Sequence, residues 1–169
     1  MSTVLLANLI KIRWIAIVGQ LITLFTIFFI FNLTIPLTEC LFVVLLSILV
    51  NFTSYFIQRG NSTLTDKKTF LFLLFDISQL VGLLFLTGGI FNPFVILILA
   101  PIIISASYLS AFWTILLSFY SIVLILIINV NYIPLNWEQK FITPSIYNIG
   151  ILVALIITIV FLAIYAYLF

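Results

Sequence analysis

The chain has 169 residues, of which 66% are hydrophobic and 6% are charged, and its formal net charge is +2. Ordinary globular chains are about half apolar and about a quarter charged, so a water-soluble domain is excluded. The single cysteine, Cys40, and the absence of histidine exclude a disulfide framework, a multi-cysteine metal site and a histidine base or phosphoacceptor. The six basic residues are scattered, which argues against nucleic acid as a partner.

Six apolar runs are long enough to cross a bilayer, for which about 20 apolar residues are needed. Lipid offers no hydrogen-bond partner to backbone amides, so these runs are predicted to be α-helices. The predicted fold class is therefore an all-α integral membrane protein, a six-helix bundle that forms one domain over residues 1–169. Its spans are predicted at residues 14–31, 40–57, 70–87, 93–109, 112–129 and 147–167.

The basic residues predict the orientation of the bundle. With six spans, five of the six basic residues fall on one side of the membrane: Lys11, Arg13, Arg59, Lys67 and Lys68. Lys140 lies on the other side. The positive-inside rule makes the basic side cytoplasmic. We therefore expect a multi-pass membrane protein with both termini in the cytoplasm.

The uncharged loop between the third and fourth spans, residues 86–94, contains helix-ending and helix-starting residues. Gly88 or Gly89 can adopt the left-handed conformation that ends a helix. Asn92 is a favoured N-cap residue, and Pro93 is a favoured first helical residue. The need to end one helix and start the next (helix punctuation) thus explains much of this loop.

The same loop also fits a ligand site. Pro93 has no N–H, so the amides of Phe94 and Val95 are predicted to remain as donors at the positive end of the fourth helix. A quinone carbonyl is an acceptor that suits this end, and Phe91 and Phe94 could stack on a planar ring. The glycines allow the backbone to approach the ligand closely. Punctuation and quinone binding both remain open at this point.

A polar cluster is predicted inside the membrane. Asp76 lies in the third span, where a carboxylate is costly and marks a functional site by default. Gln20 and Arg13 share one face of the first span, and a cluster with Asp76 would satisfy all three side chains. Gln79 lies one turn beyond Asp76 and can join them. The cluster is either a structural bond between helices or a proton-linked or signalling site.

Several stretches of the chain carry a family resemblance. They are Asp76-Ile77-Ser78-Gln79-Leu80, Leu86-Thr87-Gly88-Gly89-Ile90-Phe91-Asn92-Pro93-Phe94, Ala100-Pro101-Ile102, Ser105-Ala106 and, more loosely, Ile12-Arg13-Trp14 with Gly19-Gln20. Together they closely resemble the membrane sensor region of the RegB/PrrB/ActS redox-sensing histidine kinases. The resemblance is specific over residues 76–107 and rests on hydropathy in most of the chain.

The resemblance implies six spans in a bacterial inner membrane with both ends cytoplasmic, and ubiquinone or a related quinone as the sensed ligand, with no metal. It assigns quinone binding to Gly88, Gly89, Asn92, Pro93 and Phe94, to which the stacking argument adds Phe91. The expected function is that of a redox sensor domain in a two-component sensor histidine kinase, which reports the state of the quinone pool.

The catalytic part of such a kinase is expected outside this chain. The 169 residues contain no histidine and no ATP-binding region, so the chain is predicted not to be an enzyme by itself. It stops directly after the predicted sixth span, and we expect a cytoplasmic kinase region to follow. That region would form the homodimer and act on a response regulator. The alternative function is a subunit of a small proton-coupled transporter that uses Asp76.

Overall fold

A computed structural model describes residues 6–30, 34–57 and 64–135, together with Leu152, Ile156 and Ile159. The elements that it contains are helices. In chain order they are α1 (Leu6–Phe25), the π-helical turn η1 (Thr26–Ile30), α2 (Leu37–Ile57), α3 (Asp66–Leu86), the 3-10 helices η2 (Gly89–Phe91) and η3 (Pro93–Ile98), α4 (Leu99–Tyr108) and α5 (Ala111–Val130).

The helices confirm a multi-pass membrane protein. Four segments are long and apolar enough to cross a bilayer: Leu9–Ile30, Leu37–Phe56, Asp66–Leu86 and Ala111–Val130. They correspond to the first, second, third and fifth predicted spans. A shorter apolar helix, Phe94–Tyr108, occupies the place of the fourth. The predicted sixth span lies outside the described residues except for Leu152, Ile156 and Ile159, which are helical, so a total of six spans stays a prediction.

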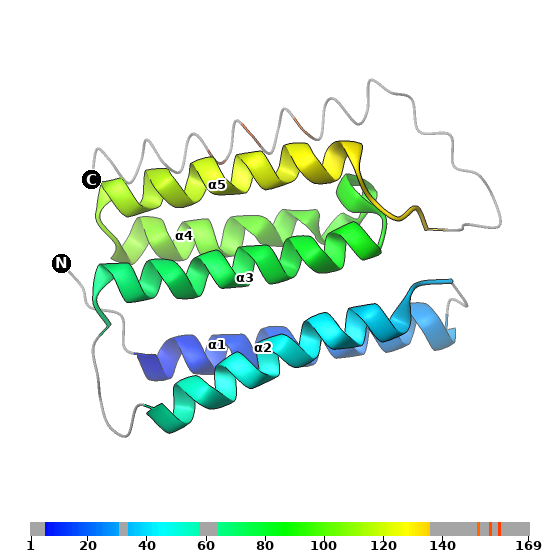
Figure 1. The fold of residues 1–169 in the computed structure, drawn as a ribbon, viewed down its shortest axis with the longest axis horizontal. Helices are drawn as coiled ribbons and strands as arrows, with labels where there is room; N and C mark the ends of the chain where they lie inside the picture. Colours follow the sequence, from blue (N-terminus) through cyan, green and yellow to red (C-terminus); the bar gives the residue numbers. More distant parts are fainter. Residues whose placement is uncertain are drawn as a thin grey trace.

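The helices lie side by side along the long axis of the molecule (Figure 1), with α1 and α2 as one pair and α3, α4 and α5 as a second group. α2 packs against α3 and connects the two groups, while α3 packs against α4 and α5. The start of α1, the end of α2 and the start of α3 lie at one end of the bundle. The loop between α3 and η3 lies at the opposite end.

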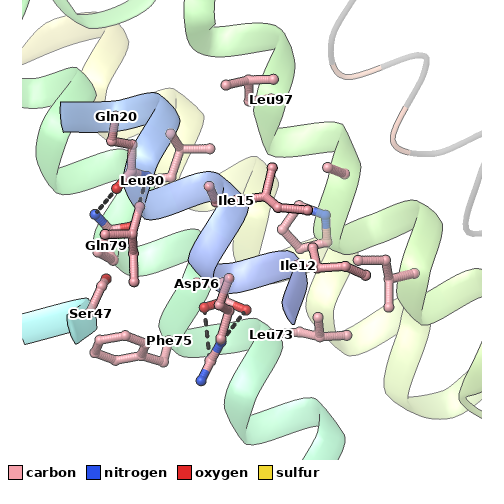
Figure 2. A pocket seen from close by; sticks show the side chains of 16 residues that line it. Ile12, Ile15, Gln20, Ser47, Leu73, Phe75, Asp76, Gln79, Leu80 and Leu97 are labelled. Atoms are coloured by element: carbon pink, nitrogen blue, oxygen red, sulfur yellow. Dashed lines mark hydrogen bonds and ion pairs between the residues drawn. The ribbon is translucent and has the colours of Figure 1, made fainter. Parts of the chain in front are cut away.

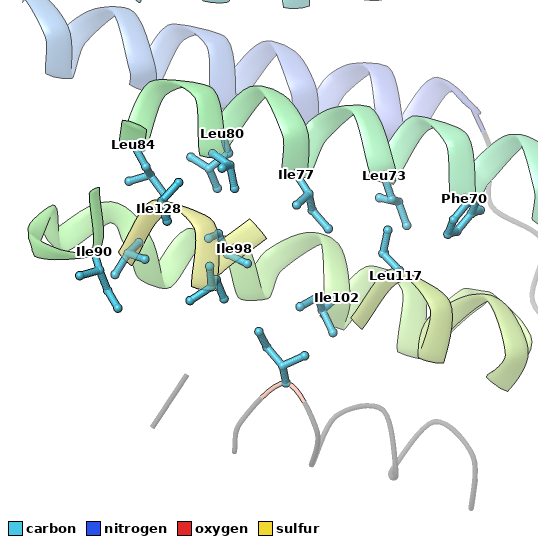
Figure 3. Packing of buried hydrophobic residues seen from close by; sticks show 14 of the residues in the cluster. Phe70, Leu73, Ile77, Leu80, Leu84, Ile90, Ile98, Ile102, Leu117 and Ile128 are labelled. Carbon is cyan, nitrogen blue, oxygen red and sulfur yellow. The ribbon is translucent and has the colours of Figure 1, made fainter. Parts of the chain in front are cut away.

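The main core is formed between α3, the η3–α4 segment and α5 (Figure 3). Residues three or four apart along α3 face inward, which is the helical period of a buried stripe. Ile159, from the predicted sixth span, is fully buried in the same cluster. Large apolar residues on the outer faces are exposed, as expected where lipid replaces water. The labelled core residues are Phe70, Leu73, Ile77, Leu80, Leu84, Ile90, Ile98, Ile102, Leu117 and Ile128.

The η3–α4 segment has few residues, but its partly 3-10 conformation makes it long enough to nearly cross the hydrocarbon layer. A 3-10 helix rises about 2.0 Å per residue, against 1.5 Å in an α-helix. The six residues of η3 and the ten of α4 therefore extend about 27 Å, close to the ~30 Å of the hydrocarbon layer. Pro101 has no N–H for the carbonyl of Leu97, and that carbonyl accepts a hydrogen bond from Leu99 instead.

The loop at the end of α3 requires its glycines. Gly88 and Gly89 have φ angles of 104° and 61°, as predicted for a left-handed helix end. A Cβ atom on Gly89 would lie 2.7 Å from the Cβ of Tyr132 and 2.9 Å from the carbonyl oxygen of Ile128. Gly89 therefore allows the loop to pack directly against the end of α5.

Gly89→Ala should destabilise the chain, because it combines a left-handed backbone that costs about 1–2 kcal/mol with a clash against backbone. Gly82→Ala is the matched control, since its Cβ would lie 3.7 Å from Val43, an ordinary contact. Thermal unfolding in detergent, followed by circular dichroism, should show a lower midpoint for Gly89→Ala only. Equal midpoints for both variants would contradict the described packing of the loop.

Candidate functional site

Asn92 organises the loop between α3 and η3. Its side-chain Oδ1 accepts a hydrogen bond from the backbone N–H of Phe94 at 2.9 Å. Its Nδ2 donates to the carbonyl oxygen and to the Oγ1 of Thr87 at 3.0 and 2.7 Å. Asn92 is buried, and Pro93 follows it as the first residue of η3. The predicted N-cap is confirmed.

The prediction that two backbone amides of this loop stay free is wrong. The Phe94 N–H is bound by the Asn92 side chain, and the Val95 N–H donates to the Asn92 carbonyl oxygen at 3.0 Å. The segment begins as a 3-10 helix, whose i to i+3 pattern gives Val95 a partner inside the first turn. Neither amide is therefore left to bind a quinone carbonyl.

The structure places the two loop phenylalanines against different neighbours. The Phe91 ring lies 5.6 Å from the Tyr132 ring, measured between centroids. The Phe94 side chain instead lines a cavity between α1 and α3. Gly88 and Gly89 pack near Leu135 and Tyr132. Of the six loop residues predicted to bind a quinone, Asn92 and Phe94 are the two that line this cavity.

Arg13 of α1 and Asp76 of α3 form an ion pair inside the membrane span. Arg13 Nη2 lies 2.8 Å from Asp76 Oδ1, and Arg13 Nε donates to Asp76 Oδ2 at 3.1 Å. Arg13 also donates to the carbonyl oxygen of Phe72 at 2.9 Å, and its guanidinium lies 4.7 Å from the centre of the Phe72 ring. The Arg13 side chain is 9% exposed and that of Asp76 is 25% exposed.

Gln20 and Gln79 form a second pair between the same helices. Each side-chain amide donates to the oxygen of the other, at 3.2 and 3.0 Å. Gln20 was expected to join Arg13 and Asp76, whereas the structure pairs it with Gln79. The two glutamines lie further along α1 and α3 than the ion pair, as Figure 2 shows for Gln20, Gln79 and Asp76. The predicted cluster is thus two separate pairs.

Two adjacent cavities of about 290 and 220 Å³ lie between α1 and the α3–η3–α4 segment. The larger one includes Arg13, Gln20, Asp76 and Gln79 in its lining (Figure 2), and the smaller one extends to Thr87, Asn92 and Phe94. We call the two cavities together the groove. Their linings share four residues: Ala16, Gln20, Leu80 and Leu97. The groove therefore connects the polar pairs with the loop.

Several residues of the groove were not anticipated from the sequence. Thr87 accepts from Asn92 and donates its hydroxyl to the Leu83 carbonyl at 2.6 Å. Ala16 and Gly19 leave space along α1, because small residues three positions apart share a helix face. The spacing of Ala16 and Gly19 was visible in the sequence. The place of Leu97 in the groove lining could not be predicted, since it depends on the 3-10 conformation of η3.

Arg13→Met should destabilise the chain because it leaves the Asp76 carboxylate without its counter-ion. Removing one partner of a buried pair costs about 3–5 kcal/mol, and the partial exposure of Asp76 places the loss at the lower end. The double variant Arg13→Met/Asp76→Leu should recover most of it, since apolar replacement of both partners is often neutral. Thermal unfolding in detergent measures the stability of the single and the double variant. Equal losses of stability in the two would contradict the coupling between Arg13 and Asp76.

The chain is 34% identical over 163 residues to the sensor histidine kinase RegB of Cereibacter sphaeroides. The alignment covers 95% of this chain but 35% of the length of that relative. No protein-family model matches the chain, and no solved structure matches it significantly. The resemblance predicted from the motifs is confirmed: this chain is homologous to the membrane portion of the sensor histidine kinase RegB.

Proposed function

We propose that this chain is the quinone-binding redox sensor region of a sensor histidine kinase. The homology supports the connection to a two-component kinase. The observation that supports a lipophilic ligand is the groove, which runs along apolar side chains from Phe94 to the ion pair Arg13–Asp76. A quinone dissolved in the bilayer is a flat apolar molecule with polar ring oxygens, and it matches that combination.

The groove is placed for entry of the ligand from the lipid. Residues at its edge, including Ile12, Ile15 and Leu97, are exposed and apolar, so the opening faces the acyl chains. Together the two cavities fall within the range of about 300–1,000 Å³ that is usual for small-molecule sites. Phe94 and Asn92 then retain a role at one end of the site, whereas Phe91, Gly88, Gly89 and Pro93 act through the shape of the loop.

Sensing requires that the oxidised and reduced ligand favour two states of the protein unequally. A quinone carbonyl only accepts hydrogen bonds, whereas a quinol hydroxyl also donates one. The groove presents donors on Arg13 and acceptors on Asp76, and both on the paired glutamines. These side-chain pairs link α1 to α3, so a change in pairing can alter how α1 lies against α3.

In the full-length protein, a cytoplasmic kinase region would receive this change, form the homodimer and pass a phosphoryl group to a response regulator. These partners belong to the proposal, because the chain spans about a third of the relative to which it is homologous. The basic residues at the start of α1 and α3 support placing that end of the bundle in the cytoplasm.

A proton-coupled transporter subunit is the second candidate. It is favoured by the position of Asp76, a carboxylate that lines a cavity inside a membrane span. Its pairing with Arg13 argues for a structural or ligand-binding role instead. Proton flux across liposomes that contain the purified chain would favour the transporter, and flux lost in Asp76→Asn would assign it to this residue.

Filling the groove should abolish quinone binding. A Cβ atom on Gly19 would meet no atom within 4 Å, so Gly19→Phe can place a ring in the smaller cavity without backbone strain. Val18→Phe is the control, because Val18 is exposed and lines neither cavity. Decylubiquinone titrated into the chain in nanodiscs should quench tryptophan fluorescence saturably in the parent and in Val18→Phe, and should bind at least tenfold more weakly to Gly19→Phe. A parent that does not bind would overturn the proposed function.

The orientation can be tested with two new cysteines in a Cys40→Ala background. Glu39 and Lys67 are exposed residues at opposite ends of the bundle. A membrane-impermeant maleimide added to spheroplasts should label Glu39→Cys directly and Lys67→Cys only after permeabilisation. The reverse pattern would place the basic end outside the cell.

A further inference from the structure

The loop and the groove differ in how much hydrogen-bonding capacity is left for a ligand. In the loop, both N–H groups of the Asn92 side chain have acceptors in Thr87, and its Oδ1 already binds the Phe94 amide. The Val95 amide is bound as well. The loop can therefore hold Phe94 in position, but it has few polar atoms left to bind the ring oxygen of a ligand.

The Gln20–Gln79 pair still has unused hydrogen-bonding capacity. A primary amide has two N–H donors and an oxygen with two lone pairs. The reciprocal pair uses one donor and one acceptor position of each glutamine. Within the part of the chain that the structure describes, one N–H and one lone pair therefore remain on each side chain. Both residues line the larger cavity, and Gln20 also lines the smaller one, so these groups lie where the two cavities meet.

We infer that the Gln20–Gln79 pair is the hydrogen-bonding subsite for a ring oxygen of a quinone or quinol in the groove. This inference rests on the proposed function. The spare N–H can donate to a quinone carbonyl, and the spare lone pair can accept from a quinol hydroxyl. The same amides connect α1 to α3, so a ligand that exchanges for one of their mutual bonds also changes the contact between these helices. Phe94 bounds the other end of the site.

The test removes the amides while keeping their shape. Gln20→Met/Gln79→Met replaces two unbranched side chains by two others of similar length, and it leaves no unpaired amide behind. Decylubiquinone should bind this variant in nanodiscs with a dissociation constant raised about 2- to 12-fold, which corresponds to one lost neutral hydrogen bond. Decylbenzene, which has no ring oxygen, should displace the quinone from the parent and from the variant with equal affinity.

Tyr120→Phe is the matched control. It removes the hydrogen bond of 2.7 Å between Ser78 and Tyr120, which joins α3 to α5 outside the groove. Its quinone affinity should equal that of the parent. Quinone binding that is unchanged in the double methionine variant would overturn the subsite and leave the proposed function intact. Equal weakening of decylubiquinone and decylbenzene would also overturn it, since the glutamines would then only hold the groove open. A parent without quinone binding would overturn the function itself.

Discussion

Hydrocarbon offers no hydrogen-bond partner, so the polar groups between these spans depend on one another. In the loop after α3, Thr87, Asn92 and the first amides of η3 satisfy each other locally. In the groove, the partners come from different helices, as in Arg13–Asp76 and Gln20–Gln79. The first arrangement is closed within the nine residues from Thr87 to Val95 and fixes the shape of the loop. The second depends on where α1 lies, and a ligand with polar atoms can compete with it.

This difference gives the bundle two kinds of contact. α3, η3, α4 and α5 share a core of buried apolar side chains, and such packing does not deform gradually. α1 packs against α3 partly through apolar side chains, such as Ile17 and Leu24 in a cluster with Leu83, and partly through long polar side chains at the edge of two cavities. A tenfold shift in an equilibrium requires about 1.4 kcal/mol, which is the scale of one hydrogen bond. The exchange of a single partner in the groove is therefore large enough to bias the position of the α1–α2 pair.

Hydropathy predicted the described spans and the membrane character, because crossing a bilayer requires long apolar runs. Local chemistry predicted the cap at Asn92 and the left-handed glycines, since both depend on neighbours in sequence. The partner of Gln20 was not predicted, because hydropathy does not determine how two helices rotate against each other. The free amide of Phe94 was predicted wrongly because the side chain of the N-cap Asn92 binds it, and that of Val95 because an α-helical first turn was assumed. The groove itself arises from the spacing of helices that are distant in the sequence.

The 3-10 conformation of η3 determines which way each of its side chains faces. Residues three apart in such a helix eclipse one another. Phe94 and Leu97 accordingly both line the groove, whereas Val95 and Ile98 are both buried in the core and Ile96 is exposed. In an α-helix, each of these rows would drift by about 60° over the same step. One inserted residue in this segment would turn the following side chains by about 120°, and the row that faces the groove would become a row that faces lipid or core.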